Sequence, residues 1–246
     1  MSGVMRIVVT ALLLLFSSAL LAPLTVRAAY PLPPYPVIFI HGINSGPDTW
    51  SDMKSRLCGN SSVVTPCISG SGGWKFGGTP IFDPSMAQVH GEDTALYKNG
   101  DFYTLKFSDN YNLSLSQQGF ELDFIIKHVK KLTGASKVIL VAHSMGGLAA
   151  RSYLQNMASD RIRFPLVSTP YSGDVAQLIT VGTPHKGSTW AKLEQIYKGC
   201  WGYPFTPETP CLGAYDLSSD PLSLALGVLA SGLADPNHGL PTSVTY

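Results

Sequence analysis

The sequence predicts an α/β domain with a mostly parallel central sheet, and three observations predict it. Short apolar runs rich in β-branched residues recur at 37–40 and 138–141, and a third, mostly apolar run lies at 175–181; such runs are typical of strands that are buried on both faces. Segments with helical spacing of apolar residues lie between these runs. Hydrophobic residues make up 45% of the 246 residues and charged residues 13%, which suits one sizeable core.

The first strand, at 37–40, ends at His41 and Gly42. A helix is expected to follow from Asp48, and its apolar residues at i, i+3 and i+7 are Trp50, Met53 and Leu57. Residues 68–101 then break the regular pattern with many glycines and prolines. We expect a long irregular insertion there, and such loops often serve function.

The second half of the domain continues the alternation. Alternating polarity at 102–107 predicts a strand, and residues 116–132 predict an amphipathic helix that Gly134 ends. The apolar side of that helix carries Phe120, Phe124, Ile125, Val129 and Leu132. No strand pattern occurs at 186–235, so we expect a lid or cap insertion; a plain surface excursion is the alternative.

The N-terminus resembles an export signal. Arg6 precedes a mostly apolar run at 7–22, and Val26-Arg27-Ala28 offers small residues for cleavage before Ala29. We therefore predict a signal peptide at 1–28, a single domain at 29–246, and a secreted or periplasmic protein. An uncleaved anchor is the alternative, because the run approaches the roughly 20 apolar residues that a membrane crossing needs.

All four cysteines follow the expected cleavage site, and an even number in an exported chain suggests disulfides. Proximity favours pairing Cys58 with Cys67 and Cys200 with Cys211. A zinc site is the competing interpretation, but the spacing is not CxxC and no histidine stands beside these residues, so we expect no metal. The net charge of +1 gives no reason to expect a nucleic-acid partner.

The residues around Ser144 carry the main chemical signal. An apolar strand pattern runs straight into Ala142-His143-Ser144-Met145-Gly146, and a helical pattern follows. Small residues two before and two after a serine permit a sharp turn that exposes its hydroxyl at the carboxyl edge of the sheet. We predict that Ser144 is a nucleophile; a serine that merely caps a helix is the alternative.

A nucleophilic serine also needs donors for the oxyanion that forms after attack. The turn aims the N–H of Met145 toward that oxygen. The second donor is expected to be the N–H of Ile43, in the loop after the first strand. His41, Gly42, His143 and Gly146 complete the two loops.

Three segments together resemble secreted α/β-hydrolase lipases and esterases: residues 36–44, 141–147 and 180–188. The resemblance implies an α/β-hydrolase fold, Ser144 as nucleophile, the Ile43 and Met145 amides as oxyanion hole, and no cofactor. The three motifs are specific for the superfamily and not for a substrate; we expect a lipid or another small-molecule ester as substrate, with transient contact to a lipid surface. It leaves the oligomeric state open.

The family's catalytic acid and histidine follow the serine on loops after two further strands. Residues 240–246 resemble the approach to the first of these strands, so we expect the last strands and both triad partners to be missing from this chain. Asp235 and His238 are in the correct order, but three-residue spacing makes it hard for both to reach catalytic positions. His185 is expected to wall the pocket rather than act as the base.

Other residues near the predicted site have simpler explanations. The His143 side chain is expected to pack or hydrogen-bond near the turn, and Asp216 and Asp220 suit helix or turn capping. Seven aromatic residues flank the site and would line an acyl-chain groove or form a satellite core: Trp74, Phe76, Phe82, Trp190, Trp201, Tyr203 and Phe205.

The sequence therefore predicts a serine hydrolase that cleaves a carboxylic ester, or a thioester, of a lipid-like substrate through an acyl-enzyme. A non-catalytic binding protein that retains the pocket is one alternative. A lipid acyltransferase is another, because enzymes of that class share the same turn.

Overall fold

The computed structural model describes residues 31–59, 73–92, 96–160, 163–164 and 167–188. The predicted signal peptide falls outside these residues, and so does nearly all of the predicted cap. Cys67, Cys200 and Cys211 also fall outside, while Cys58 is buried directly after a helix. The disulfide pairing therefore stays a prediction.

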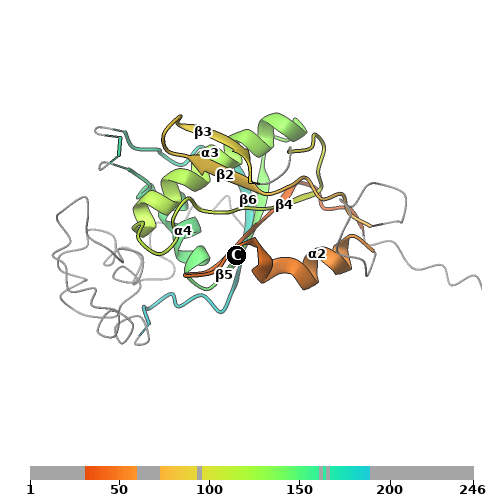
Figure 1. Ribbon diagram of the computed structural model, residues 1–246, viewed down its shortest axis with the longest axis horizontal. Helices are drawn as coiled ribbons and strands as arrows, with labels where there is room; N and C mark the ends of the chain where they lie inside the picture. The colour runs from red at the N-terminus through yellow and green to blue at the C-terminus, as the bar shows by residue number, and fades with distance from the viewer. Residues whose placement is uncertain (1–30, 60–72, 93–95, 161–162, 165–166, 189–246) are drawn as a thin grey trace, which may run out of the picture.

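A parallel sheet of four strands forms the centre of the described structure (Figure 1). Its strands are β1 (Val37–Ile40), β4 (Phe102–Thr104), β5 (Val138–His143) and β6 (Val175–Val181), in the order β4-β1-β5-β6. All three pairings are parallel. This confirms the predicted fold class, and β1 lies between β4 and β5 with every residue buried.

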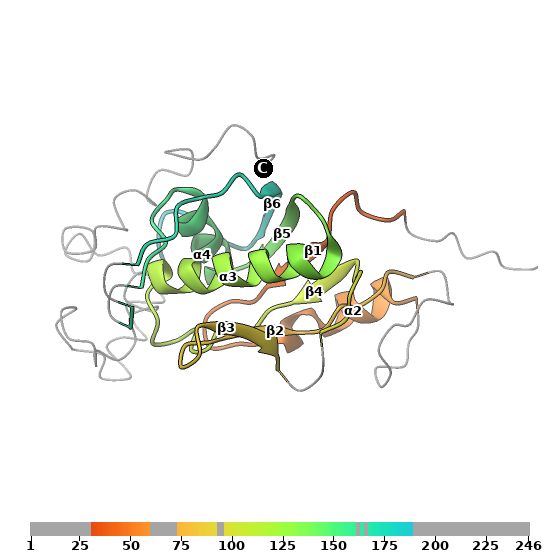
Figure 2. The same ribbon diagram turned by 90° about the horizontal axis from the view of Figure 1, so that it is seen from above.

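Helices cover both faces of this sheet (Figure 2). Ile38 and Ile40 of β1 join the cluster formed with α3 (Leu115–Thr133) and α4 (Met145–Leu154). Val37 and Phe39 point the other way and pack against Trp50, which ends the 3-10 helix η1 (Pro47–Trp50) before α2 (Ser51–Leu57). Successive residues of a strand face opposite sides, so β1 holds both layers together.

The predicted helix at 116–132 is confirmed as α3, with one extra residue at each end. Ser114 accepts a hydrogen bond from the Gln117 N–H, and the Gln117 side chain accepts one from the Ser114 N–H. This reciprocal capping box fixes the start of the helix. Gly134 follows the helix with φ of 71°, a left-handed conformation that glycine adopts without steric cost.

The prediction of an irregular insertion at 68–101 is wrong in part. Strands β2 (Pro80–Asp83) and β3 (Gln88–Gly91) form an antiparallel hairpin there. Phe82 of β2 is fully buried, and its ring lies 4.9 Å from that of Phe124 on α3. The hairpin is held by packing onto α3, which short-range sequence patterns do not reveal.

Three local predictions need correction. The strand at 102–107 is shorter than expected, and four successive residues from Phe102 to Leu105 are buried rather than alternating. Met53 is 41% exposed, so it does not belong to an apolar stripe with Trp50 and Leu57. The stripe fails because the segment begins as a 3-10 helix, which changes the angular spacing of its side chains. Strand β5 continues two residues beyond the predicted 138–141.

Within the described ranges, no helix has the length and hydropathy that a membrane crossing requires.

Candidate active site

Ser144 stands at the turn between β5 and α4, with φ of 52° and ψ of −127°. Its N–H donates to the Val181 carbonyl at 2.9 Å, which extends the β5–β6 pairing up to the serine. Positive φ is unfavourable for a residue with a Cβ, and such residues persist where the surrounding structure holds them. The sheet on one side and α4 on the other hold Ser144 in this conformation.

The Ser144 side chain makes no capping hydrogen bond to α4. A serine at a helix N-terminus ordinarily accepts a hydrogen bond from an N–H two or three residues later. The interpretation of Ser144 as a helix cap is therefore wrong. The side chain is half-buried, and its hydroxyl is not used to stabilise the helix.

Two glycines let α4 approach its neighbours closely. A Cβ on Gly146 would lie 2.4 Å from the His41 carbonyl oxygen, and one on Gly147 would lie 2.2 Å from Oγ1 of Thr183. Both distances are well inside van der Waals contact. The start of α4 is thus packed between the end of β1 and the segment after β6, and this packing fixes the height of Ser144 above the sheet.

The loop after β1 lies directly against the serine. A Cβ on Gly42 would lie 2.9 Å from Cβ of Ser144 and 3.4 Å from its Oγ. Ile43 is the next residue and packs partly buried against the core, while Met145 is fully buried as the first residue of α4. The N–H of a first helical residue has no partner inside its helix. The predicted assignment of both amides to an oxyanion hole stays a prediction.

His41 serves to hold the loop. It is 1% exposed, and its Nε2 accepts a hydrogen bond from the Phe107 N–H at 3.3 Å. Its Nδ1 lies 3.0 Å from the Gly42 carbonyl oxygen, so Nδ1 carries the proton and donates. Burial lowers the pKa of His41, with only partial compensation from the Gly42 carbonyl. The ring is therefore neutral and tied at both nitrogens.

His143 precedes the serine and is half-buried. Its ring meets the Trp50 ring edge-on at 6.4 Å, on the η1 side of the sheet. A Cβ on Gly42 would lie 3.3 Å from Nδ1 of His143, and this nitrogen has no hydrogen-bond partner in the described structure. The expected packing role near the turn fits this position.

His185 follows β6 and is bound to two side chains. The Arg151 guanidinium lies 3.1 Å from its Nδ1, and Thr180 Oγ1 lies 3.2 Å from its Nε2. Arginine only donates, so Nδ1 accepts and Nε2 carries the proton. Burial, followed by the Arg151 charge, lowers the pKa of His185. Both nitrogens are used, which fits the expected role in the wall of the pocket.

The structure also brings in residues that sequence reasoning missed. Asn110 donates from Nδ2 to the Gly42 carbonyl and, at 3.1 Å, to the Ser45 carbonyl. Arg151 is 1% exposed in an otherwise apolar helix. A signal for each was present: Asn110 lies in a polar run after a buried strand, and Arg151 is the single charged residue of its helix.

Three of the predicted aromatic residues lie in packed cores. Phe82 packs on α3, while Trp74 and Phe76 pack against Phe102 with ring centroids 6.4 and 5.2 Å apart. Phe82 is fully buried, and Trp74 and Phe76 pack partly buried against a core cluster, so these three fit the expected satellite core. Asp216, Asp220, Asp235, His238 and the other four aromatics lie outside the described residues. Among the residues that are described, no group of three His, Cys, Asp or Glu side chains is placed to hold a metal ion.

Residues 32–204 match the family described as having a PGAP1-like alpha/beta domain. The chain belongs to this family. The match covers more than half of the chain and includes Ser144, Gly42 and His185. The four-stranded parallel sheet with helices on both faces is the central part of the α/β-hydrolase fold of lipase-like proteins.

Among curated proteins, the PGAP1-like domain is similar to two named triacylglycerol lipases. It is 27% identical over 161 residues to that of Pseudarthrobacter phenanthrenivorans and, again over 161 residues, 27% identical to that of Burkholderia plantarii. The matches cover 65% of this chain but 36% and 32% of those proteins. The chain thus spans about a third of the length of the curated relatives it matches.

Two solved structures resemble the PGAP1-like domain at low identity. A gene product of Listeria innocua is 17% identical with a TM-score of 0.44, covering 81% of this chain and 80% of that one. The mature form of the Bacillus licheniformis lipase BlEst2 is 18% identical with a TM-score of 0.43, covering 85% of this chain and 64% of that one.

Proposed function

We propose that this protein hydrolyses carboxylic esters of lipid-like substrates, with Ser144 as the nucleophile. The observation that carries the proposal is the backbone of Ser144, held at φ of 52° with its side chain unused by the helix that follows. A structural serine needs neither feature. A nucleophile needs both, because its hydroxyl must stand clear of the sheet and remain available for attack.

The reaction divides into two acyl transfers. Oγ of Ser144 attacks the ester carbonyl carbon, and its proton passes through a base to the leaving alcohol as the C–O bond breaks. Water then attacks the acyl-serine ester, which releases the carboxylic acid and restores the hydroxyl. The amides of Ile43 and Met145 are proposed to hold the oxyanion in both steps, and each such donor is typically worth on the order of 10² to 10³ in rate.

The base is proposed to come from outside the described residues. His41 and His185 belong to the segments 36–44 and 180–188, which resemble those of lipases. Both nitrogens of each ring are already hydrogen-bonded. A general base must have a free lone pair within reach of the serine proton. Asp235 and His238 are the candidates that this sequence offers.

The substrate class is proposed from the curated relatives, which are named triacylglycerol lipases. An uncharged acyl ester also suits a protein whose net charge is +1, because no strong field favours an ionic substrate. Thioesters remain within the same proposal, since the serine attacks their carbonyl in the same way.

The experiment compares a C-terminally complete form of the protein, taken as wild type, with its Ser144→Ala variant on p-nitrophenyl butyrate and p-nitrophenyl palmitate. Ser51→Ala is the matched control, because Ser51 is exposed and its hydroxyl contacts only the Asp48 carbonyl at 2.9 Å. We expect hydrolysis by wild type and Ser51→Ala and its loss in Ser144→Ala. A fluorophosphonate should add to Ser144 in the same two proteins. Equal hydrolysis by wild type and Ser144→Ala would refute the proposal.

We also propose that the protein is exported, with cleavage before Ala29 leaving the domain at 29–246. The apolar run at 7–22 and the small residues at 26 and 28 support this. N-terminal sequencing of the protein recovered outside the cytoplasm tests it. An N-terminus that retains Arg6 would contradict it.

A further inference from the structure

The carbonyl oxygen of Gly42 is surrounded by three side-chain donors. Ser45 Oγ donates to it at 2.9 Å, Nδ1 of His41 lies 3.0 Å away, and Asn110 Nδ2 donates at short range. A carbonyl oxygen has two lone pairs, so its accepting capacity is fully used. We call Ser45, His41 and Asn110 the Gly42 clamp.

Each member of the clamp can donate to the Gly42 carbonyl, and Asn110 Nδ2 also lies 3.2 Å from Nδ1 of His41. Asn110 Nδ2 is an amide nitrogen, which can only donate. His41 takes its tautomer from the Phe107 N–H, which occupies Nε2 and leaves the proton on Nδ1. Ser45 has Gly42 as its acceptor. Turning the Gly42 carbonyl away would leave these donors without that partner.

The orientation of this carbonyl fixes the orientation of the next amide. The described chain contains no cis peptide bond, and in a trans peptide the C=O and the following N–H point in opposite directions. The carbonyl of Gly42 points to the clamp. The Ile43 N–H therefore points away from the clamp.

Because residue 42 is a glycine, the orientation of the Gly42–Ile43 peptide has to be fixed by other residues. Its close approach to Ser144 excludes a side chain, since a Cβ would lie 2.9 Å from Cβ of Ser144. A glycine is conformationally permissive, so the peptide that follows it can turn over with little steric resistance. The same contact that requires glycine thus loosens the peptide that is proposed to carry an oxyanion donor.

Asn110 comes from a segment that is itself firmly held. Gln118 of α3 is fully buried and donates to the carbonyls of Asn110, at 3.3 Å, and Leu113, at 2.9 Å. The same Nε2 lies 3.8 Å from Sδ of Met145. Gln118 therefore contacts both the segment that carries Asn110 and the residue that is proposed to supply the other oxyanion amide.

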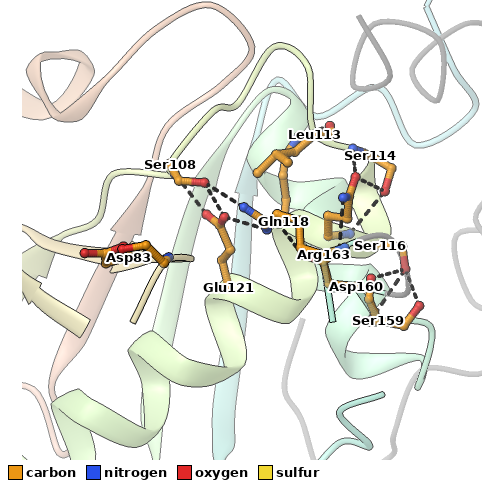
Figure 3. A network of polar contacts seen from close by, with 12 residues as sticks. Asp83, Ser108, Leu113, Ser114, Ser116, Gln118, Glu121, Ser159, Asp160 and Arg163 are labelled. Atoms are coloured by element: carbon orange, nitrogen blue, oxygen red, sulfur yellow. Dashed lines mark hydrogen bonds and ion pairs between the residues drawn. The ribbon is translucent and has the colours of Figure 1, made fainter. Parts of the chain in front are cut away.

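The segment that carries Asn110, residues 108–113, is also held at its first residue, Ser108 (Figure 3). The Glu121 carboxylate accepts from the Ser108 N–H at 2.9 Å and from the Arg163 guanidinium at 2.9 Å. Figure 3 shows these contacts converging beside α3, with Gln118 on the same helix and Leu113 on the segment before it. Asn110 is therefore presented from a fixed backbone.

We propose that Asn110 is a positioning residue that, with Ser45, locks the Gly42–Ile43 peptide so that the Ile43 N–H faces the oxyanion. This inference rests on the proposed function, because it assigns a role in the same reaction. Asn110 touches no substrate. It acts through the Gly42 carbonyl, and its effect belongs to the transition state, where negative charge develops on the substrate oxygen.

The test uses Asn110→Asp in the full chain, which keeps the shape of the side chain but replaces its donor with an acceptor. Asn99→Asp adds the same charge at an exposed loop position and is the control. Crystal structures of both variants show the orientation of the Gly42–Ile43 peptide, and hydrolysis of p-nitrophenyl butyrate gives kcat and KM. Asn110→Ala serves in the same way if Asn110→Asp does not fold.

We expect a reversed Gly42–Ile43 peptide in Asn110→Asp and a kcat lower by roughly 10- to 100-fold at unchanged KM, approaching the loss of one oxyanion donor. Ser45→Ala should lower kcat by about threefold, because two donors remain. An unmoved peptide or an unchanged kcat overturns the inference. If Ser144→Ala retains the activity, the proposed function is refuted. The orientation of the Gly42–Ile43 peptide in Asn110→Asp then still shows whether Asn110 holds this peptide.

Discussion

Gly42 and Ser144 lie so close together that no side chain fits between them. A Cβ on Gly42 would lie 2.9 Å from Cβ of Ser144 and 3.3 Å from Nδ1 of His143. The residues are 102 positions apart, and adjacent parallel strands β1 and β5 bring them together at their carboxyl ends. The contact joins the proposed nucleophile to the loop that is proposed to hold its oxyanion.

Gly42→Ala should therefore impair the site more than the fold. The added methyl displaces the Ser144 side chain, and overpacking of this kind costs about 1–3 kcal/mol of unfolding free energy. We expect kcat for p-nitrophenyl butyrate to fall at least about tenfold, because misplacing a reacting group by 1 Å can cost 10²-fold. Gly46→Ala is the control: nothing lies within 4 Å of its Cβ, and its φ of −144° suits alanine. Equal activity of the two variants would contradict the prediction.

Ser144→Gly should be more stable than Ser144→Ala although both lose activity. Backbone strain at a non-glycine residue with φ of 52° costs of order 1–3 kcal/mol, and glycine relieves it. The greater freedom of glycine in the unfolded chain offsets about 0.4–1 kcal/mol. We expect a net difference of about 1 kcal/mol in urea unfolding. An alanine variant as stable as the glycine variant would show that the turn stores no strain.

The stability of the protein should fall as the pH falls below about 6.5, because burial lowers the pKa of His41. Between the lowered folded pKa and 6.5, the unfolded chain binds a proton that the folded chain does not, so acid favours unfolding. One such group contributes a slope of up to about 1.4 kcal/mol per pH unit. His41→Gln should flatten the pH dependence of urea unfolding, whereas His90→Gln, at an exposed position of β3, should leave it unchanged. A slope identical in all three proteins would contradict this.

His185→Gln should leave the acidic limb of the kcat/KM against pH profile in place. Arg151 donates to Nδ1 of His185, and burial together with that charge lowers the pKa of this histidine. The single lone pair of the neutral ring is occupied by the Arg151 donor, so His185 cannot accept the serine proton. We expect an unchanged apparent pKa and at most about a tenfold loss of kcat/KM from disturbed packing. Disappearance of the acidic limb would make His185 the base.

The local sequence was sufficient to predict an element wherever that element depends on residues close together in the chain. The strands at 37–40 and 175–181 were predicted with the bounds that the structure has, because β-branched apolar residues are concentrated in both segments. The expected burial holds for β1 but not for β6, where Ile179 and Val181 are exposed. Helix α3 was predicted within one residue at each end, since its period and its terminal Gly134 are both local. The turn at Ser144 follows from small residues placed between a strand pattern and a helix pattern.

Sequence reasoning failed where a contact partner is distant. The hairpin β2–β3 is stabilised because Phe82 packs on α3, some 40 residues later in the chain. No pattern within residues 68–101 indicates that contact. The alternation at 102–107 misled because β4 is covered on both faces, and exposure depends on neighbours in space rather than on local polarity.

The sequence by itself determined the parallel sheet, the strand-to-helix turn at Ser144 and the loop at Gly42. Each depends on conformational preferences that act over a few neighbouring residues. Only the tertiary structure decided which side chains hold those loops. Asn110 reaches the Gly42 carbonyl across 68 residues, and Arg151 reaches His185 across 34. Such hydrogen bonds arise because the carboxyl ends of parallel strands meet at one edge, and their partners are set by strand order rather than by sequence distance.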